Sequence, residues 1–291
     1  MIIIKIFGGL GNQMFQYAFG KYLSKRNDVD LLLDISYFRN QSLRKFELNH
    51  LNVKNLQFAE ESQIRIVRKE SNPISFLFRK LNTAVSPYYK WSVIEQMNFD
   101  FDPNYLKVEA PAYVSGYWHS ENYFLGIADL IRSEFDYIKD LAPYAQSISN
   151  QIGTGTSCSI HIRRGDYVND ANTYVVHGVC SMDYYLRAIA AINAQFKDVT
   201  FFVFTDDIPW VKTSSLFNNT NFTIVENTDN HFEDFKLMSK CSHHIIANSS
   251  FSWWAAYLGD FPSKVVISPS KWFKNKLADR ISITPKTWIQ L

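Results

Sequence analysis

The sequence predicts an α/β fold made of two α/β domains that face a cleft, within a chain of 291 residues. Two patterns predict it: a strand, glycine turn and helix at the amino end, and a regular alternation of strands and helices after residue 157. The composition agrees, because 46% of the residues are hydrophobic and 20% are charged, which is typical of globular proteins with a substantial core.

The amino-terminal part begins with a βαβ unit. Residues 2–7 form an apolar, β-branched run that predicts a buried strand, and residues 8–12 predict the turn after it. The next helix carries an apolar stripe at helical spacing, formed by Phe15, Ala18, Phe19, Tyr22 and Leu23. A second strand follows at 31–33. Further along, residues 112–117 predict a strand and residues 121–137 a helix.

The carboxyl-terminal half predicts a doubly wound parallel sheet, because its strands alternate with helices that serve as crossovers. The strands are expected at 158–162, 200–205, 222–226, 243–247 and 264–267, and the helices near 182–196, 207–216, 232–240 and 249–258. The stretch 143–156, with two glycines and several polar residues, predicts a linker. The predicted domains are therefore 1–150 and 151–270, and the segment 271–291 is expected to pack back on the first domain.

The most informative segment is 159–167, an apolar strand that ends in two arginines, a glycine and a carboxylate. His161 and Arg163 share a face of the strand, because residues two apart point the same way, and Arg164 lies at the strand exit. Open α/β sheets bind ligands at the carboxyl ends of their strands, and a guanidinium matches phosphate oxygens. The segment predicts an anion site; the alternative is two arginines in surface salt bridges.

The glycine turn at 8–11 opens a helix, which invites a dinucleotide-binding interpretation. The fingerprint fails, because Met14 stands where a third glycine is needed. A purely structural tight turn is the alternative to ligand contact. Asn12 and Gln13 stand at the helix start, where backbone N–H groups and side-chain amides reach a hydroxylated or anionic ligand.

Two more polar segments follow predicted strands. The run 248–252 holds three serines and an asparagine at a helix start, more donors than one helix cap needs, and therefore predicts a phosphate site. Asp206 and Asp207 end the strand 200–205, where carboxylates commonly hold ribose hydroxyls or a guanine edge. Together with the arginines, these groups fall at the carboxyl ends of the strands of the second domain.

A metal site is the competing idea, because two carboxylates in three residues chelate the metal of a nucleotide diphosphate in some enzymes. Asp100 with Asp102, and Asp28 with Asp30, have this spacing, but neither pair follows a predicted strand. Magnesium binds through one or two carboxylates plus phosphate and water, which spacing alone does not reveal. No metal is expected, because the arginines already supply positive charge.

Bulk properties exclude several classes of protein. A net charge of +2 gives no support for nucleic-acid binding. The three cysteines form no CxxC pair, which argues against a disulfide framework or a zinc site. No run approaches the roughly 18 apolar residues of a membrane span, and the amino end does not have the pattern of a signal peptide. We therefore expect a soluble cytoplasmic protein that binds a nucleoside diphosphate without metal. Glycosyl transfer is the reaction that suits such a site, because it requires stabilisation of the departing diphosphate.

In its motifs the chain resembles the bacterial α-1,2-fucosyltransferases of glycosyltransferase family 11. Residues 161–166 resemble the His-x-Arg-Arg-Gly-Asp motif that this family shares with α-1,6- and protein O-fucosyltransferases. Departures from the family pattern are small, with His119 and Asn122 in place of the usual Gln and Lys. The resemblance runs from end to end, through the segments 8–17, 115–124, 161–166, 234–239 and 247–258.

This resemblance implies a GT-B type fold, with 1–150 on the acceptor side and 151–270 binding GDP-L-fucose. It implies inverting transfer of L-fucose to the 2-hydroxyl of a terminal β-galactoside, with no cofactor beyond the donor substrate. Arg163 then contacts the diphosphate, Asp206 lies near the nucleoside, and His161 holds the geometry of the site. The residues implied in donor binding are Gly11, Asn12, Arg163, Arg164, Asp206, Asn248, Ser249, Ser250, Phe251 and Ser252.

An inverting transfer needs a base for the proton of the acceptor, or at least an oriented acceptor. Asp166 and Asp170 are the carboxylates nearest to the arginine motif, and His177 is a third candidate. Asp166 is equally suited to be the structural partner of an arginine. The base therefore stays open.

Two other functions also stay open. One is a fucosyltransferase of other regiochemistry, such as α-1,6, and the other is a non-catalytic nucleotide-sugar binding protein. The natural acceptor is not predicted, because lipopolysaccharide O-antigen units, capsular repeats and free oligosaccharides all end in β-galactosides. A lipid-linked acceptor would bring the protein to the inner face of a bacterial membrane as a peripheral protein.

Overall fold

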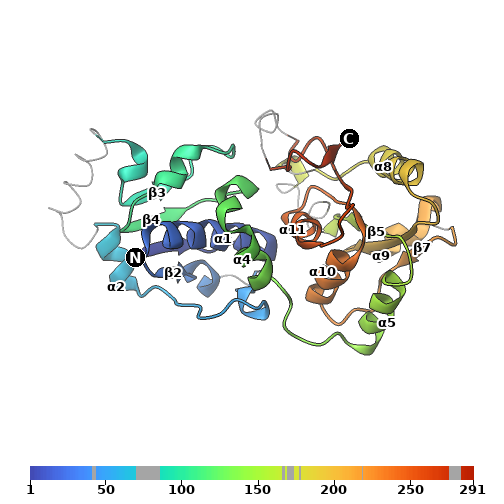
Figure 1. Ribbon diagram of the computed structural model, residues 1–291, viewed down its shortest axis with the longest axis horizontal. Helices are drawn as coiled ribbons and strands as arrows, with labels where there is room; N and C mark the ends of the chain where they lie inside the picture. Colours follow the sequence, from blue (N-terminus) through green and yellow to red (C-terminus); the bar gives the residue numbers. More distant parts are fainter. Residues whose placement is uncertain are drawn as a thin grey trace. The chain divides into compact units, whose positions relative to one another are not determined.

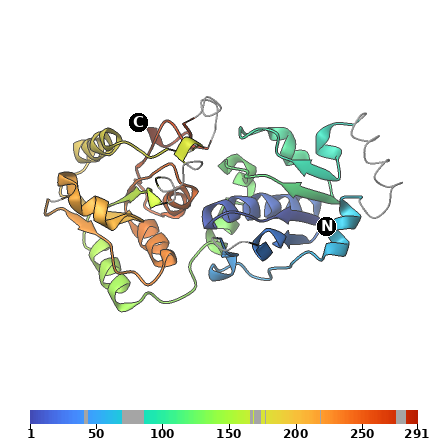
Figure 2. The same cartoon turned by 180° about the vertical axis from the view of Figure 1, so that it is seen from behind.

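The protein consists of two compact units, Met1–Asp136 and Tyr137–Leu291. The computed structural model describes residues 1–40, 44–69, 86–165, 168, 174–176, 178–217, 219–274 and 283–291. Each unit holds its own parallel sheet with helices packed on it (Figure 1), and Figure 2 shows the same elements from behind. The units are described one at a time below.

The sheet of the first unit has the order β2-β1-β4-β3, with every pair parallel. Its strands are β1 (Ile2–Lys5), β2 (Leu31–Asp34), β3 (Val93–Glu95) and β4 (Ala112–Ser115). The strands predicted at 2–7, 31–33 and 112–117 are confirmed, whereas β3 follows an irregular, aromatic stretch and was not predicted. Because β2 and β4 flank β1 on its two sides, chain connections diverge at the carboxyl end of β1.

Helix α1 (Leu10–Asn27) joins β1 to β2 and lies along the first sheet (Figure 1). Its apolar stripe is buried, with Phe15, Ala18 and Phe19 fully enclosed, which confirms the predicted βαβ unit. The turn before α1 depends on Gly8, whose φ of +79° lies in the left-handed region that side chains rarely adopt. The helix ends at Asp28, which is itself left-handed and bonds back to the last turn.

The rest of the first unit is built from short pieces. Among its described residues, the other α-helices are α2 (Glu61–Val67) and α4 (Ala128–Glu134), and the 3-10 turns are η1 (Ser36–Asn40), η2 (Leu48–His50), η3 (Tyr88–Lys90), η4 (Pro103–Lys107), η5 (Glu121–Tyr123) and η6 (Leu125–Ile127). The single helix predicted at 121–137 is therefore wrong. Phe124 interrupts it with a non-helical backbone (φ −136°, ψ 10°), and its ring is buried beside Phe15 of α1.

The second unit contains the predicted doubly wound sheet, in the order β10-β9-β8-β5-β6-β7. Its strands are β5 (Ser157–Ile162), β6 (Thr200–Thr205), β7 (Phe222–Ile224), β8 (His243–Ile245), β9 (Val266–Ser268) and β10 (Ile289–Gln290). The chain starts at β5, builds outward to β7, then returns to the other side of β5 with β8. The point where the order reverses therefore lies between β5 and β8, and open α/β sheets bind ligands at the carboxyl ends there.

Helices cover this sheet, and the predicted ones are confirmed. They are α8 (Met182–Gln195), α9 (Ile208–Thr213), α10 (His231–Lys240) and α11 (Ser250–Leu258), with the 3-10 turn η7 (Ser215–Phe217) after α9. The core between α8 and the sheet contains Ile160, Phe201 and Tyr185, all buried.

The expected linker was wrong, whereas the expected packing of 271–291 on the first domain stays a prediction. The stretch 143–156 is mostly helix α5 (Pro143–Ile152), begun by a proline at its first position and anchored by buried Ala145 and Ile148, and the units divide before it. The end of the chain supplies β10, which pairs with β9 and so belongs to the second unit. Trp253 of α11 holds this segment by donating a hydrogen bond to the carbonyl of Ile283.

Candidate functional site

The two arginines lie at the carboxyl end of β5, as predicted, beside the carboxyl end of β6. The strands are paired in parallel with Ile162 opposite Thr205, so the residues that follow, Arg163 and Asp206, also lie opposite each other. Arg163 Nη1 is 2.8 Å from Asp206 Oδ2. The other carboxylate oxygen, Oδ1, accepts a hydrogen bond from the backbone N–H of Arg164 at 2.8 Å. Asp206 thus binds both arginine residues at the edge of the sheet.

Gly165 makes this contact possible, because a Cβ at its position would lie 2.5 Å from Asp206 Oδ2. Real side chains do not tolerate such an approach, so the third residue of the arginine–arginine–glycine sequence must be small. The glycine of the motif is explained here by close packing against Asp206 rather than by an unusual backbone angle.

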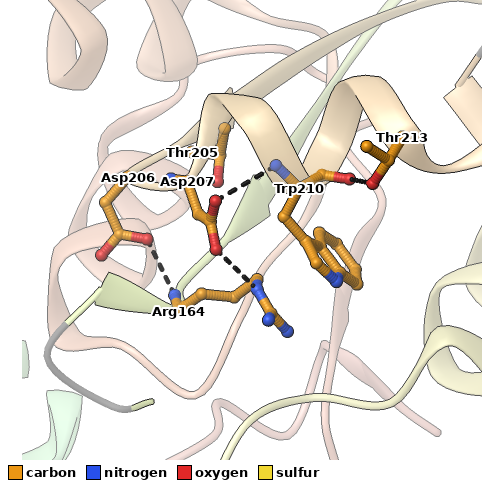
Figure 3. Close-up of polar contacts among 6 residues, drawn as sticks. All are labelled: Arg164, Thr205, Asp206, Asp207, Trp210 and Thr213. Carbon is orange, nitrogen blue, oxygen red and sulfur yellow. Dashed lines mark hydrogen bonds and ion pairs between the residues drawn. The ribbon is translucent and has the colours of Figure 1, made fainter. Parts of the chain in front are cut away.

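Arg164 has a carboxylate of its own. Its Nε donates to Asp207 Oδ2 at 3.0 Å, and its guanidinium carbon lies 4.1 Å from the centre of the Trp210 ring (Figure 3). Asp207 Oδ1 accepts from the backbone N–H of Trp210 at 3.1 Å and caps helix α9. The start of α9 therefore presents a carboxylate and an indole face to the same guanidinium.

Each arginine is therefore in an ion pair, which was the alternative to an anion site. The pairs are not surface contacts of two free side chains: the side chains of Arg163 and Arg164 are only 25% and 19% exposed. A carboxylate behind a guanidinium that is mostly buried holds it in place, and a guanidinium held in this way is preorganised to bind an anion. The location of Asp206 near a nucleoside stays a prediction.

His161 is buried under this edge of the sheet. Burial, together with the neighbouring positive charge of Arg163, lowers the pKa of His161 to about 3, so its imidazole is neutral at physiological pH. Its ring lies 5.8 Å from that of Phe251, at the start of α11. A neutral, enclosed ring beneath Arg163 fits the predicted role of holding the geometry of the site.

The run 248–252 lies at the carboxyl end of β8, across the point where the strand order reverses. Asn248 is buried and its amide donates to the carbonyls of Gly178 and Trp272, so this side chain ties two loops together. Ser252 Oγ donates to the carbonyl of Ser249, which is a local contact inside the helix start. These two residues have structural partners, and their contact with a ligand stays a prediction.

Ser249 and Ser250 differ from these neighbours. Ser249 is the N-cap residue of α11, yet its side chain makes no capping hydrogen bond. Capping therefore does not account for this serine, although it was the structural alternative for this run. The first turn of α11 adds backbone N–H groups, which favour an anion at a helix start.

The first unit brings Asn12 together with His119. His119 Nε2 lies 3.0 Å from Asn12 Oδ1, and because a carbonyl oxygen accepts, Nε2 carries the hydrogen. His119 follows β4 and Asn12 stands in the first turn of α1, beside buried Gly11. Rings of Phe15 and Tyr117 flank the histidine at 5.0 and 5.3 Å. The sequence identified His119 only as a departure from a family pattern.

The side chain of Gln13 has a structural role in the glycine turn. Its amide donates to the carbonyls of Gly8 and Lys45, and its oxygen accepts from the N–H of Glu47 at 2.9 Å. All of its contacts join the turn to the segment after η1. Gln13 is therefore a brace, whereas Asn12 and His119 carry the polar groups beside the turn.

Sequence reasoning missed the part played by two residues, Trp210 and Asp234. Trp210 gave no signal except its position three residues after an N-cap aspartate. Asn230 caps α10, and Asp234, in the first turn of this helix, is half-buried. Burial raises the pKa of Asp234 to about 6, although Thr228 donates a hydrogen bond to it. A carboxyl with such a shift is typical of functional or constrained positions.

The candidate bases Asp166, Asp170 and His177 lie outside the described residues. Among the residues that are described, no group of three or more His, Cys, Asp or Glu side chains is arranged to hold a metal ion. Of the carboxylate pairs considered for a metal, Asp102 caps η4 and accepts a hydrogen bond from Tyr88. In the same described ranges, no helix is long and apolar enough to cross a membrane.

Comparison with known proteins gives a consistent result over the whole chain. A family model described as Glycosyl transferase family 11 matches residues 1–291. An alpha-1,2-colitosyltransferase of Escherichia coli is 32% identical over 298 residues, covering 100% of this chain and 99% of its own. The O-antigen biosynthesis glycosyltransferase WbnK of Escherichia coli is 33% identical over 303 residues, covering 98% of each chain.

Among solved structures, the α-1,6-fucosyltransferase NodZ, co-crystallised with GDP, has the same fold. The TM-score is 0.52 at 14% sequence identity, over 91% of this chain and 94% of that one. With a parallel sheet in each unit, this likeness confirms the predicted fold class, an α/β protein of the GT-B type.

Proposed function

The chain belongs to glycosyl transferase family 11, and we propose that it transfers L-fucose from GDP-L-fucose to the 2-hydroxyl of a terminal β-galactoside, with inversion and without a metal ion. The observation that carries the proposal is the pair of arginines at the carboxyl end of β5, braced from behind by Asp206 and Asp207. They lie at the carboxyl end of β5, one of the two strands that border the reversal point of a doubly wound sheet, where nucleotides bind.

In the proposed reaction, the acceptor oxygen attacks the anomeric carbon of fucose while the bond from that carbon to the β-phosphate oxygen breaks. Negative charge then gathers on the departing diphosphate. Arg163 and Arg164 stabilise this charge with N–H donors that are already in place, as a metal ion does in other transferases. The start of α11, with Ser249 and Ser250, adds further donors.

The remaining roles follow the family resemblance. Asn248, Phe251 and Ser252 are the further residues of the second unit that it implies in donor binding, and Asp206 lies towards the nucleoside. Gly11 and Asn12 are the residues of the first unit that it implies in donor binding. Neutral His161 keeps the β5 end rigid rather than transferring a proton. The proton of the acceptor goes to Asp166, Asp170 or His177, or to water if the acceptor is only oriented.

A second donor is favoured by one observation, the 32% identity to an alpha-1,2-colitosyltransferase over the full chain. Colitose is L-fucose without its 3-hydroxyl, so the same diphosphate site and the same α-1,2 chemistry serve both donors. The two differ only in groups around the 3-position of the sugar. GDP-colitose is therefore the alternative donor.

One experiment tests the reaction, the donor and the linkage together. The purified chain is incubated with GDP-fucose, GDP-colitose or GDP-mannose and a panel of β-galactosides including lactose, and released GDP is measured. Linkage analysis of the product is expected to find fucose at the 2-position of galactose. Fucose at another position would show a different regiochemistry, and higher turnover with GDP-colitose would assign that donor. GDP binding without release on the whole panel would indicate a non-catalytic binding protein.

The same panel addresses the acceptor. Relatives that include an O-antigen biosynthesis glycosyltransferase support repeat units of bacterial O-antigen as substrates. Lipid-linked and free forms of one repeat unit distinguish a membrane-surface reaction from one in solution. Membrane association and a cytoplasmic location stay predictions until that comparison is made.

A further inference from the structure

Three contacts hold the side chain and backbone of Arg164. The backbone N–H donates to Asp206 Oδ1 at 2.8 Å, Nε donates to Asp207 Oδ2 at 3.0 Å, and the plane of the guanidinium lies over Trp210 at 4.1 Å (Figure 3). One face of the guanidinium is thus covered by an indole and one edge by a carboxylate. An arginine with this many constraints loses little conformational entropy when it binds a ligand.

The terminal amino groups of Arg164 are the donors left over. Among the residues that the structure describes, none accepts a hydrogen bond from Nη1 or Nη2 of this side chain. Figure 3 shows both nitrogens pointing away from Asp207, on the far side of Nε. Two parallel N–H donors on one edge of a guanidinium match two oxygens of a phosphate group.

The two residues that hold the Arg164 side chain, Asp207 and Trp210, both belong to the start of α9. Together they are called the clamp. Asp207 is the N-cap residue and Trp210 the third residue of the helix, so one helical turn fixes both groups relative to each other. Pro209 stiffens that turn, and the Trp210 ring packs on the core of the second unit. Asp207 uses Oδ1 for the helix and Oδ2 for Arg164, so one carboxylate couples the helix to the guanidinium.

We infer that Trp210 and Asp207 are positioning residues that hold Arg164 with its Nη1 and Nη2 donors turned toward the diphosphate of the donor. The inference rests on the proposed function for the identity of the ligand. Trp210 covers the guanidinium face and excludes water from it, while Asp207 fixes its orientation through Nε. Neither residue contacts the donor, and both act only through Arg164.

The test measures binding of GDP, GMP and guanosine to the full-length chain by calorimetry. Trp210→Leu removes the aromatic face and is expected to weaken GDP binding on the order of tenfold, while guanosine binding stays unchanged. Trp210→Phe keeps an aromatic face and is expected to restore most of the affinity. Asp207→Ser keeps a good helix cap but cannot reach Nε, and is expected to act like Trp210→Leu.

Arg187 and Asp183 supply a matched control. They form the same Nε to Oδ2 contact, at 2.9 Å, on the exposed surface of α8. Asp183→Asn is expected to leave the affinity for all three ligands unchanged. Melting temperatures of each variant show whether a loss of binding follows from a loss of folding.

A double-mutant cycle separates positioning from a general packing role. If Trp210 acts through Arg164, adding Trp210→Leu to Arg164→Ala costs no further GDP affinity. Additive losses would overturn the inference, and so would an equal weakening of guanosine and GDP binding by Trp210→Leu.

Different results would overturn the proposed function and the inference about Trp210 and Asp207. A wild-type chain that binds no GDP would overturn the proposed donor but still allows the clamp to be tested with inorganic pyrophosphate. If pyrophosphate binds and Trp210→Leu and Asp207→Ser leave its affinity unchanged, the clamp is wrong. Tight GDP binding that neither variant alters would overturn the inference and leave the proposed function intact.

Discussion

Arg163 and Asp206 face each other across two paired strands, with Nη1 and Oδ2 2.8 Å apart. The contact follows from the register of β5 and β6, since Ile162 is opposite Thr205 and the next residue on each strand exit carries the charge. Asp206 also accepts a hydrogen bond from the backbone N–H of Arg164, so one carboxylate holds both residues that follow β5. The charge that the proposed reaction needs is therefore in place before a ligand arrives.

Arg163→Ala is expected to lower kcat by about 10²–10³-fold, because a fixed donor to the departing diphosphate is lost. The measurement is GDP release with saturating GDP-fucose and lactose. Arg187→Ala, which removes an exposed arginine paired with Asp183 on α8, is the control and is expected to be neutral. Near-normal turnover of the Arg163 variant would remove this residue from the mechanism.

Gly165→Ala is expected to disturb the site through Asp206. The added Cβ would lie 2.5 Å from Asp206 Oδ2 and force the carboxylate off Arg163, at a cost of about 1–3 kcal/mol in stability. GDP affinity is expected to fall about tenfold or more, since the brace behind both arginines moves. Gly155→Ala is the matched control, because nothing lies within 4 Å of its Cβ position. Equal melting temperature and affinity in both variants would contradict the packing argument.

Asp234→Asn is expected to stabilise the protein at neutral pH and not in acid. Burial raises the pKa of the Asp234 carboxyl from 3.8 to about 6, so its contribution to stability is complete below about pH 4 and is lost as the pH rises through 6. Asparagine does not titrate and can still accept the hydrogen bond of Thr228. The expected gain is on the order of 1–2 kcal/mol at pH 7.5, after allowance for partial exposure, and nearly zero at pH 4.

Thermal unfolding at pH 4, 6 and 7.5 checks this dependence. Asp183→Asn, on the exposed face of α8, controls for the general effect of removing one negative charge. A gain for the Asp234 variant that is the same at every pH would point to packing rather than to titration.

His119→Gln is expected to keep full activity, whereas His119→Ala is expected to lower it. Glutamine retains an N–H donor for Asn12 Oδ1, and alanine removes it, which costs about 0.5–1.5 kcal/mol for a neutral hydrogen bond. The loss is expected in kcat/KM, about two- to tenfold, because Asn12 is proposed to bind the donor. Steady-state kinetics with varied GDP-fucose and with varied lactose measure it, and a change confined to the KM of lactose would place the pair on the acceptor side.

Removal of metal ions is expected to leave the rate unchanged. The proposed diphosphate site uses the Arg163 and Arg164 guanidinium groups, whose charge does not depend on a bound ion. GDP release is compared with and without excess EDTA, and after adding Mg²⁺ back. Strong inhibition by the chelator that Mg²⁺ reverses would show that a metal ion takes part.

Local pattern predicted much of the fold. The β-branched run at 2–5 and the apolar stripe of α1 are visible in the sequence, because burial of one face imposes a period. The same holds for β5, β6 and the helices of the second unit. Short pieces without a period, such as β3 and β10, were missed, and the polar helix α5 was taken for a linker.

The sequence by itself determined that arginines, aspartates and serines stand at strand exits, because a parallel sheet puts every carboxyl end on one edge. Which of them touch was decided only by the tertiary structure. Strand order places β6 beside β5 and pairs Asp206 with Arg163, 43 positions apart, and the first turn of α9 brings Trp210 onto Arg164. Such lateral neighbours depend on the packing of whole elements, which no local spacing encodes.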